Sequence, residues 1–322
     1  MLQIAIIGAG NLGGRHLQGL AGLHHECEIH LVDPCRESLA TARERWAELP
    51  ANPRICGLRD HGDVSSLPKH LELVIVATTS DVRLAVIRKL IDRAEVRYLL
   101  LEKVLFPRLA EYEEASEILR RSNVRAWVNC ARRLFDVYAR AREEFRAGKL
   151  IHMDVAGGNW GLGCNGIHFL DMMAFMAGEI PGRFNTSGLS PGTIPAKRPG
   201  FVEFSGTIAA MTSGCTISLT AHGTSAARHL VTLRGENLSY VIDELAGRYW
   251  KLDGTGAWTA GVFQIPLQSQ MTGKVANQIL ATGECGLPEY EESSQVHQPF
   301  LQALINHLDP GRMHDAAACL IT

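Results

Sequence analysis

The sequence contains no long hydrophobic run. None of its segments approaches the ~20 consecutive apolar residues that a membrane-spanning helix needs. The N-terminal stretch MLQIAIIGAG has no basic region ahead of its apolar residues, and these stop at Gly8, unlike a secretory signal peptide. We therefore expect a cytoplasmic protein with no membrane partner.

An excess of charge of one sign is also missing. The 32 basic and 34 acidic residues give a formal net charge of −2. The basic residues form no stripe with interleaved aromatic side chains, so we expect no nucleic-acid partner.

The eight cysteines form no C-x-x-C pair and no zinc-like spacing with histidine, which fits a reducing cytoplasm. His24 and His25 are adjacent, so on a helix their side chains would point about 100° apart and would not share a metal ion. We expect no metal site.

The 322 residues are too many for one ordinary core, and 46% of them are hydrophobic, which favours two folded domains. In residues 1–125, short apolar runs alternate with helical patterns, which is typical of a parallel sheet with helical crossovers. We predict a doubly wound Rossmann domain here. Its predicted strands are 2–7, 28–32, 71–78, 96–101 and 124–128, and its helices are 11–23, 36–49, 81–92 and 110–121, with Ser80 as an N-cap.

Residues 126–322 have a different pattern, in which glycines separate apolar runs without intervening helices. This favours a C-terminal α+β domain with a mainly antiparallel sheet, for substrate binding and oligomerisation. The segment 187–200 is predicted as a long loop. The predicted strands are 152–159, 202–211, 216–221, 229–234 and 238–243, and the helices are 135–147 (closed by Gly148), 166–176, 273–282 and 293–306.

A glycine-rich loop follows the first strand and opens the first helix. In Gly8-Ala9-Gly10-Asn11-Leu12-Gly13, the first glycine allows a tight turn and the second lets a pyrophosphate approach the backbone. The third allows close packing of helix on strand. The N–H groups of the helix N-terminus, around Asn11 and Leu12, would then face the phosphates. The alternative is that the glycines only shape a turn.

An acid stands at the distance expected for dinucleotide binding. Asp33 lies 20 residues past Gly13, at the end of the second predicted strand. A carboxylate there accepts hydrogen bonds from the adenosine ribose and repels a 2′-phosphate, which favours NAD over NADP. The nearby Arg36 weakens this preference. The alternative is that Asp33 only caps the next helix.

Together these features resemble the Gfo/Idh/MocA family (glucose–fructose oxidoreductase, inositol dehydrogenase and rhizopine catabolism). Further matches follow in order along nearly the whole chain: Thr78, Thr79 and Ser80 at a strand end, the pair Glu102-Lys103, and Gly166-x-His168-x-x-Asp171.

The resemblance implies that Glu102, Lys103 and the segment 78–80 face the cofactor. Lys103 would hydrogen-bond the reacting oxygen, and His168 would exchange a proton with the substrate hydroxyl while hydride passes to or from NAD. Imidazole titrates near pH 7 and suits this role. A lysine ammonium stabilises developing oxyanion charge.

Three positions depart from the family pattern. Val104 replaces the proline after Glu-Lys, and because a cis bond before valine costs ~2.5–4 kcal/mol, we expect a trans bond. Cys164 replaces the family aspartate four residues before His168, and neither Cys164 nor Asn165 replaces a carboxylate base. Arg83 stands in place of a common histidine. These departures weaken the inference about the reaction more than the inference about the fold.

Five further residues are candidates for substrate binding: Asn159, Trp160, Cys164, Asn165 and Asp171. Trp160 either stacks on a sugar ring or belongs to the core. Asp171 lies one helical turn after His168, so it either orients the imidazole or is structural. Arg132 and Arg133 either clamp an anion or pair across the domain interface.

Two functions follow from these observations. The first is an NAD(P)-dependent oxidoreductase acting on a hydroxyl or ketone of a sugar, cyclitol or nucleotide sugar; within this class of enzyme, the resemblance also allows a lyase or glycosidase that uses NAD transiently. The second is a catalytically altered, NAD-binding sensor or regulatory protein of the same fold. The exposed face of the antiparallel sheet suggests a homo-oligomer, and the identity of the substrate is beyond the sequence.

Overall fold

The computed structural model describes residues 1–309 and 318–322. The chain forms two compact units. The first comprises Met1–Phe106, Glu111–Asn129 and Pro266–Glu291, and the second comprises Pro107–Ala110, Cys130–Ile265 and Glu292–Thr322. They differ from the predicted ranges 1–125 and 126–322 mainly because a segment from late in the chain returns to the first unit.

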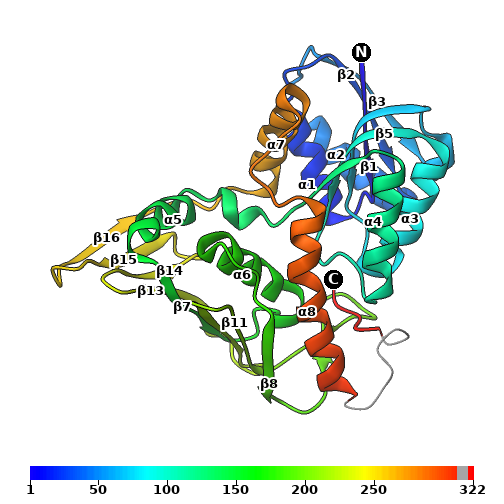
Figure 1. Ribbon diagram of the computed structural model, residues 1–322. Coiled ribbons are helices and arrows are strands. Elements are labelled where there is room, and N and C mark those ends of the chain that lie inside the picture. Colours follow the sequence, from blue (N-terminus) through cyan, green and yellow to red (C-terminus); the bar gives the residue numbers. More distant parts are fainter. Residues whose placement is uncertain (310–317) are drawn as a thin grey trace. The chain divides into compact units, whose positions relative to one another are not determined.

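The first unit contains a six-stranded parallel sheet in the order β3-β2-β1-β4-β5-β6. Because crossovers between parallel strands are right-handed, α1 and α2 cover one face and α3 and α4 the other (Figure 1). The elements are β1 (Leu2–Ile7), α1 (Asn11–Leu20), β2 (Cys27–Val32), α2 (Arg36–Ala47), β3 (Ile55–His61), β4 (His70–Val76), α3 (Ser80–Arg93), β5 (Glu95–Leu101), α4 (Ala110–Arg121) and β6 (Arg125–Val128).

The strand order changes direction between β1 and β4. β1 pairs with β2 on one side and with β4 on the other, and the inner residues of β1 and β4 are fully buried. Chains leaving β1 and β4 therefore diverge to opposite faces of the sheet. In open parallel sheets, ligands bind at the carboxyl ends of the strands at such a switch point.

Helix α7 (Gln268–Thr282) belongs to the first unit because it packs directly on α1 (Figure 1). The contact depends on glycines: a Cβ on Gly19 would lie 2.6 Å from Cβ of Thr272, and one on Gly273 would lie 2.5 Å from the carbonyl oxygen of Gly19. Asn277 also accepts from the backbone N–H of His24. The two helices can approach this closely only where side chains are absent.

The second unit contains an eight-stranded sheet in the order β16-β15-β14-β13-β7-β12-β11-β8, with one parallel pair, β7 and β12. Helices α5 and α6 pack on one face (Figure 1). The elements are α5 (Asp136–Gly148), β7 (Leu150–Gly157), α6 (Leu162–Ala177), β8 (Arg183–Leu189), β9 (Ile194–Pro195), β10 (Val202–Glu203), β11 (Gly206–Met211), β12 (Thr216–Ala221), β13 (Leu230–Gly235), β14 (Ser239–Asp243), β15 (Arg248–Leu252), β16 (Trp258–Val262) and α8 (Tyr290–Leu308). The predicted fold class, a parallel Rossmann sheet followed by a mainly antiparallel α+β domain, is confirmed.

Several local predictions are wrong. Ser80 is the first residue of α3 and Thr79 is its N-cap. Gly148 lies inside α5, and Lys149 follows it with φ of 38°. The predicted strand 202–211 is divided into β10 and β11, and the predicted loop 187–200 includes the end of β8 and all of β9. Among the described residues, no helix is long and apolar enough to span a membrane, and no histidine, cysteine or acid cluster could hold a metal ion.

Candidate functional site

The glycine loop has the geometry that a dinucleotide requires. Gly8 has φ of +97°, and a Cβ there would lie 2.9 Å from the carbonyl carbon of Ala77. A Cβ on Gly13 would lie 1.7 Å from the carbonyl oxygen of Gly8, so helix α1 meets the strand end without room for a side chain. A Cβ on Gly10 would meet no atom within 4 Å. The middle glycine therefore faces open space, where a pyrophosphate could approach the backbone.

The N-terminus of α1 is uncapped by any side chain. Gly10 is its N-cap without a side-chain hydrogen bond, and the first turn carries no acid. Asn11 at the first helical position is exposed. Free N–H groups and the positive end of the helix dipole make such a terminus a site for anions. The loop and helix therefore fit the pyrophosphate of NAD.

Asp33 follows β2 and braces the glycine loop. Its carboxylate accepts hydrogen bonds from the N–H of Ala9 at 2.7 Å and from the N–H of Cys35 at 2.8 Å. Each carboxylate oxygen retains capacity for a further hydrogen bond, so Asp33 can still accept from a ribose hydroxyl. Arg36 is exposed, three residues further on.

Three chain segments leave the carboxyl edge of the first sheet beside one another, because β1 pairs with β4 and β4 with β5. They are the glycine loop after β1, the segment Thr78-Thr79-Ser80 after β4, and Glu102-Lys103 after β5. Thr78 and Thr79 are half-buried, and Ser80 is buried. The structure thus brings together the residues predicted to face the cofactor.

Lys103 is half-buried, and its peptide bond to Val104 is cis. The expectation of a trans bond is wrong, because it considered only the local preference of a non-proline residue. Val104 and Leu105 are buried, and their carbonyl oxygens both accept from the guanidinium of Arg83. These contacts between distant parts of the chain define the backbone after Lys103, and local preference does not contain them.

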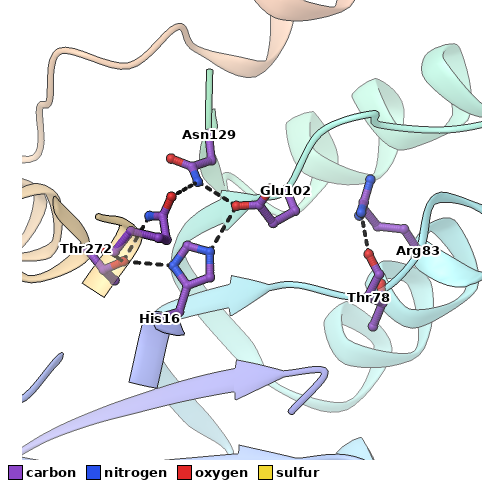
Figure 2. A network of polar contacts seen from close by, with 7 residues as sticks. His16, Thr78, Arg83, Glu102, Asn129 and Thr272 are labelled. Atoms are coloured by element: carbon purple, nitrogen blue, oxygen red, sulfur yellow. Dashed lines mark hydrogen bonds and ion pairs between the residues drawn. The ribbon is translucent and has the colours of Figure 1, made fainter. Parts of the chain in front are cut away.

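Arg83 is itself buried, with 1% of its surface exposed. It lies in the first turn of α3 and donates to the carbonyl oxygen of Thr78 (Figure 2) as well as to Val104 and, at 2.8 Å, Leu105. The planar guanidinium presents several N–H donors in a fixed fork, which suits three neighbouring carbonyls. Arg83 therefore joins the segment after β4 to the segment after β5.

On the other side of Lys103, Glu102 belongs to a closed ring of hydrogen bonds (Figure 2). Asn129 donates to Glu102 Oε1 and, at 2.9 Å, to Gln268 Oε1. Gln268 Nε2 donates to Thr272 Oγ1 at 3.0 Å. His16 completes the ring, with Nδ1 2.9 Å from Thr272 Oγ1 and Nε2 2.9 Å from Glu102 Oε1.

The ring holds Glu102 as a carboxylate. Burial raises the pKa of Glu102, but the hydrogen bond and charge of His16, the charge of Lys103 and the Asn129 amide outweigh it, so the pKa lies below its ordinary value. An ionised carboxylate only accepts, so His16 Nε2 is the donor in this contact. Thr272 Oγ1, which lies 2.9 Å from His16 Nδ1, also donates to the backbone carbonyl of Gln268 at 2.9 Å.

In the second unit, the candidate residues gather around helix α6. Gly161 precedes the helix with φ of +80°. The carboxylate of Glu203, which is 6% exposed, accepts from the N–H groups of Gly163 at 2.6 Å and Cys164 at 3.1 Å. A carboxylate at this end of a helix is stabilised by the helix dipole. The side chain of Cys164 does not replace the family carboxylate, but the carboxylate of Glu203 binds the backbone N–H of Cys164.

His168 and Asp171 are both buried on α6, at 9% and 1% exposure. The Asp171 oxygens each accept from Arg133 at 2.7 Å, and Arg133 also pairs with Glu292. Burial raises the pKa of Asp171 to about 6, although the charge and hydrogen bonds of Arg133 act in the opposite direction. Asp171 is thus committed to Arg133, and its role toward substrate stays a prediction.

Arg132 and Arg133 form their ion pairs within the second unit, so the prediction of pairing across the domain interface is wrong. Arg132 donates twice to the buried Glu244 at 2.9 Å. Tyr138 and His229 also bond Glu244, at 2.7 and 3.2 Å. Burial raises the pKa of Glu244, but Arg132, His229 and Tyr138 hold it well below its ordinary value.

Trp160 packs at the start of this helix rather than standing free. Its Nε1 donates to the carbonyl of Thr220, and its ring lies edge-on to Phe169 with centroids 5.5 Å apart. Asn165 donates to the carbonyl of Trp160 at 2.8 Å, while Asn159 is exposed. Trp160 is half-buried, so one part of its surface is available to a ligand.

Sequence reasoning missed the residues that surround Glu102. His16 lies three residues after Gly13 on the same helix and could have been considered part of the loop motif. Asn129 follows β6 at the same sheet edge as Lys103, which is a further signal. Gln268 and Thr272 have no local signal, because they come to the site only through the packing of α7.

Residues 2–130 match the sequence model of the GFO_IDH_MocA oxidoreductase family, NAD-binding Rossmann fold. Residues 2–130 are therefore similar to the NAD-binding domain of the Gfo/Idh/MocA oxidoreductases, in agreement with the predicted family. No curated protein sequence matches the chain.

Solved structures match the fold over nearly the whole chain. One is an oxidoreductase from Agrobacterium radiobacter in complex with NAD+, L-tartaric acid and magnesium (TM-score 0.73, 15% identity, 97% of each chain). Another is UDP-N-acetylglucosamine 3-dehydrogenase GnnA from Acidithiobacillus ferrooxidans (TM-score 0.71, 14% identity, 94% of this chain and 96% of that one). A third is a super-repressor mutant of Gal80p from Saccharomyces cerevisiae (TM-score 0.72, 12% identity, 96% of each chain).

Proposed function

We propose that the protein is an NAD-dependent dehydrogenase or reductase that acts on a hydroxyl or ketone group of a sugar, cyclitol or nucleotide sugar. The observation that carries the proposal is the glycine loop at the switch point, where Gly10 faces open space and Asp33 stands beside the loop. The similarity in fold to an NAD+ complex and to a nucleotide-sugar dehydrogenase supports it.

The proposed roles of the residues follow from the resemblance to the family. The nicotinamide supplies hydride transfer when it is bound. Lys103, beside the ionised Glu102, donates a hydrogen bond to the reacting oxygen and stabilises charge that develops there. His168 takes or returns the hydroxyl proton. Asn159, Trp160 and Asn165 contact the substrate, with Cys164 and Asp171 as the remaining candidates.

NAD rather than NADP is the proposed cofactor because of Asp33. A 2′-phosphate on the adenosine ribose would lie against its carboxylate, and two anions in contact repel each other. Arg36 is exposed and has no partner that fixes it beside Asp33 among the described residues. We expect NADH to bind at least tenfold more tightly than NADPH.

Calorimetric titration with NADH and NADPH tests the cofactor assignment. Asp33→Asn should weaken NADH binding about tenfold, or ~1.4 kcal/mol, and affect NADPH less, because the repulsion is removed together with an acceptor. The matched control is Asp92→Asn, which changes an exposed acid in the last turn of α3, at the end away from Thr78 and Thr79. If neither nucleotide binds the wild-type protein at high micromolar concentration, the oxidoreductase proposal is wrong.

A turnover screen with polyols and ketoses then tests the catalytic roles. Lys103→Met and His168→Asn should each reduce turnover by a factor of about 10²–10⁴ while NADH still binds. Lys89→Met, an exposed lysine on α3, should leave turnover unchanged. Full turnover in either active-site variant would contradict the assigned role.

A second candidate function is an NAD-binding regulator. The similarity in fold to Gal80p and the absence of a carboxylate at Cys164 favour it. A regulator would bind NADH and show no turnover with any substrate of the screen, and Lys103→Met would not alter its binding of NADH or of a protein partner. The screen and the titration therefore distinguish the two functions.

A homo-oligomer is proposed as well. Residues on β15, β16 and nearby turns expose apolar surface, with Trp258 60%, Val262 80% and Trp250 39% exposed. Large exposed apolar groups on a sheet are typical of association surfaces, and a second copy of the chain would cover them. Sedimentation velocity should give an oligomer that Trp258→Arg dissociates; a monomeric wild-type protein would contradict the proposal.

A further inference from the structure

Lys103 is held from both sides along the chain. The residue before it, Glu102, is one corner of the closed hydrogen-bond ring, and the residues after it, Val104 and Leu105, bind Arg83. Lys103 itself is half-buried between two buried neighbours. Its backbone therefore has little freedom, although it lies in a loop.

The two anchors come from helices that begin at cofactor-facing loops. His16 lies on α1, which starts at the glycine loop, and Arg83 lies on α3, which starts at the segment after Thr78 and Thr79. Both anchors are buried, at 0% and 1% exposure. A shift of either helix would therefore be transmitted to one side of Lys103.

We propose that the ring around Glu102 and the fork of Arg83 form a clamp that fixes the direction of Lys103, and that His16 and Arg83 are positioning residues. The catalytic value of the clamp rests on the proposed function, in which Lys103 faces the reacting oxygen. Fixing a reacting group in place removes an entropic cost from the reaction. Two departures from the family pattern, Val104 in place of proline and Arg83 in place of histidine, belong to this clamp, because Arg83 binds the carbonyl of Val104 directly.

The arginine does by hydrogen bonding what a proline at position 104 would do through its ring, namely restrict the backbone beside the lysine. A lysine at position 83 would present a single ammonium in place of a planar fork. Arg83→Lys should therefore hold one or two of the three carbonyls and restore part of the clamp. Arg83→Met keeps the aliphatic stem and removes every donor.

Carbon-13 NMR of reductively methylated lysines reports on the clamp without any substrate. The chain has only seven lysines, and Lys103→Arg assigns the Lys103 signal. In the wild-type protein we expect this signal to be displaced from those of the exposed lysines. Arg83→Met and Thr272→Val, which removes one hydroxyl from the ring, should each move it at least halfway to the exposed position, and Arg83→Lys less far.

Controls separate positioning from general loosening. Arg88→Met, on the exposed side of the same helix, should leave the Lys103 signal in place. The signals of Lys89 on α3 and Lys274 on α7 should stay unchanged in the clamp variants, whereas partial unfolding would move them too. An undisplaced Lys103 signal in wild-type protein, or a signal that neither clamp variant moves, would overturn the proposal.

Addition of NADH distinguishes the failure of the clamp from the failure of the proposed function. If NADH moves the Lys103 signal in wild-type protein and the response falls at least twofold in Arg83→Met, both proposals are supported. If the clamp variants move the signal but NADH has no effect on the wild-type protein, the clamp is supported and the cofactor role of Lys103 is wrong.

Discussion

The two compact units hold their candidate residues by different chemistry. In the first unit, Glu102 is the only acid of a ring whose other members are two amides, a hydroxyl and an imidazole. In the second unit, α6 and the chain before it are held by bidentate arginine–carboxylate pairs, Arg133 with Asp171 and Arg132 with Glu244. The ring thus combines one ionised acid with hydrogen bonds between neutral groups that each contribute modestly, whereas a buried arginine–carboxylate pair is stable only while both charges are present.

The comparison predicts its largest effect in the second unit. Arg133→Met should lower the free energy of unfolding by about 3–5 kcal/mol, because it leaves the Asp171 carboxylate buried without its partner. Chemical denaturation measures the change. Arg146→Met removes an exposed arginine that pairs with Glu143, and it should cost less than about 0.5 kcal/mol. A loss under 1 kcal/mol for Arg133→Met would remove the distinction between the two units.

Two glycine substitutions in the first unit should separate an effect on stability from an effect on NADH binding. Gly13→Ala places a methyl group against the carbonyl of Gly8 and should cost about 1–3 kcal/mol of stability as well as NADH binding. Gly10→Ala meets no protein atom, so it should leave the unfolding midpoint nearly unchanged and weaken NADH binding about tenfold or more. Thermal unfolding and NADH titration check both. Equal effects of the two substitutions on stability would show that the loop is architecture alone.

The smallest expected effect is a difference between Glu102 and Asp171 in how they make stability depend on pH. The folded-state pKa of Glu102 is lowered, so its stabilising contribution is present at neutral pH and is lost as the pH falls below the ordinary carboxylate range. The pKa of Asp171 in the folded state is raised to about 6, so as the pH falls the folded protein binds this proton before the unfolded chain does. The contribution of Asp171 to stability therefore increases as the pH falls from 7 to 4.

Urea denaturation between pH 7 and pH 4 measures this difference. As the pH falls, the stability advantage of the wild type over Glu102→Gln should shrink, whereas the stability of the wild type should rise relative to Asp171→Asn. Each change should be at most about 1.4 kcal/mol per pH unit. Gaps that change in the same direction for both variants would contradict the assigned environments.

The parallel half of the fold could be predicted because its inner strands are short, continuous apolar runs that alternate with helical patterns. Strands β3, β8, β15 and β16 were missed, because each is largely polar or exposed and lacks the buried pattern of the inner strands. β3, β8 and β16 are edge strands and β15 lies next to one, and such strands owe their conformation to a neighbour in the sheet rather than to their own hydrophobic period.

In the candidate site, too, local features could be predicted and features that depend on distant parts of the chain could not. The glycine loop and Asp33 could be predicted because their geometry is local to one strand–loop–helix unit. The ring around Glu102 could not, because His16 and Thr272 are 256 residues apart in the chain. The cis bond after Lys103 was missed because the surroundings of that segment are set by Arg83, which lies on helix α3.

The return of α7 to the first unit has a consequence for synthesis of the chain. When the ribosome has completed Asn129, the whole parallel sheet has been made, but Thr272, the last partner of His16, is still about 140 residues away, in the segment Pro266–Glu291. At ~5–20 residues per second, this gap lasts about 7–30 s. During that time the glycines on α1 that will receive α7 stay uncovered, so the nascent sheet must wait until the segment Cys130–Ile265 of the second unit has been synthesised before its own site can be finished.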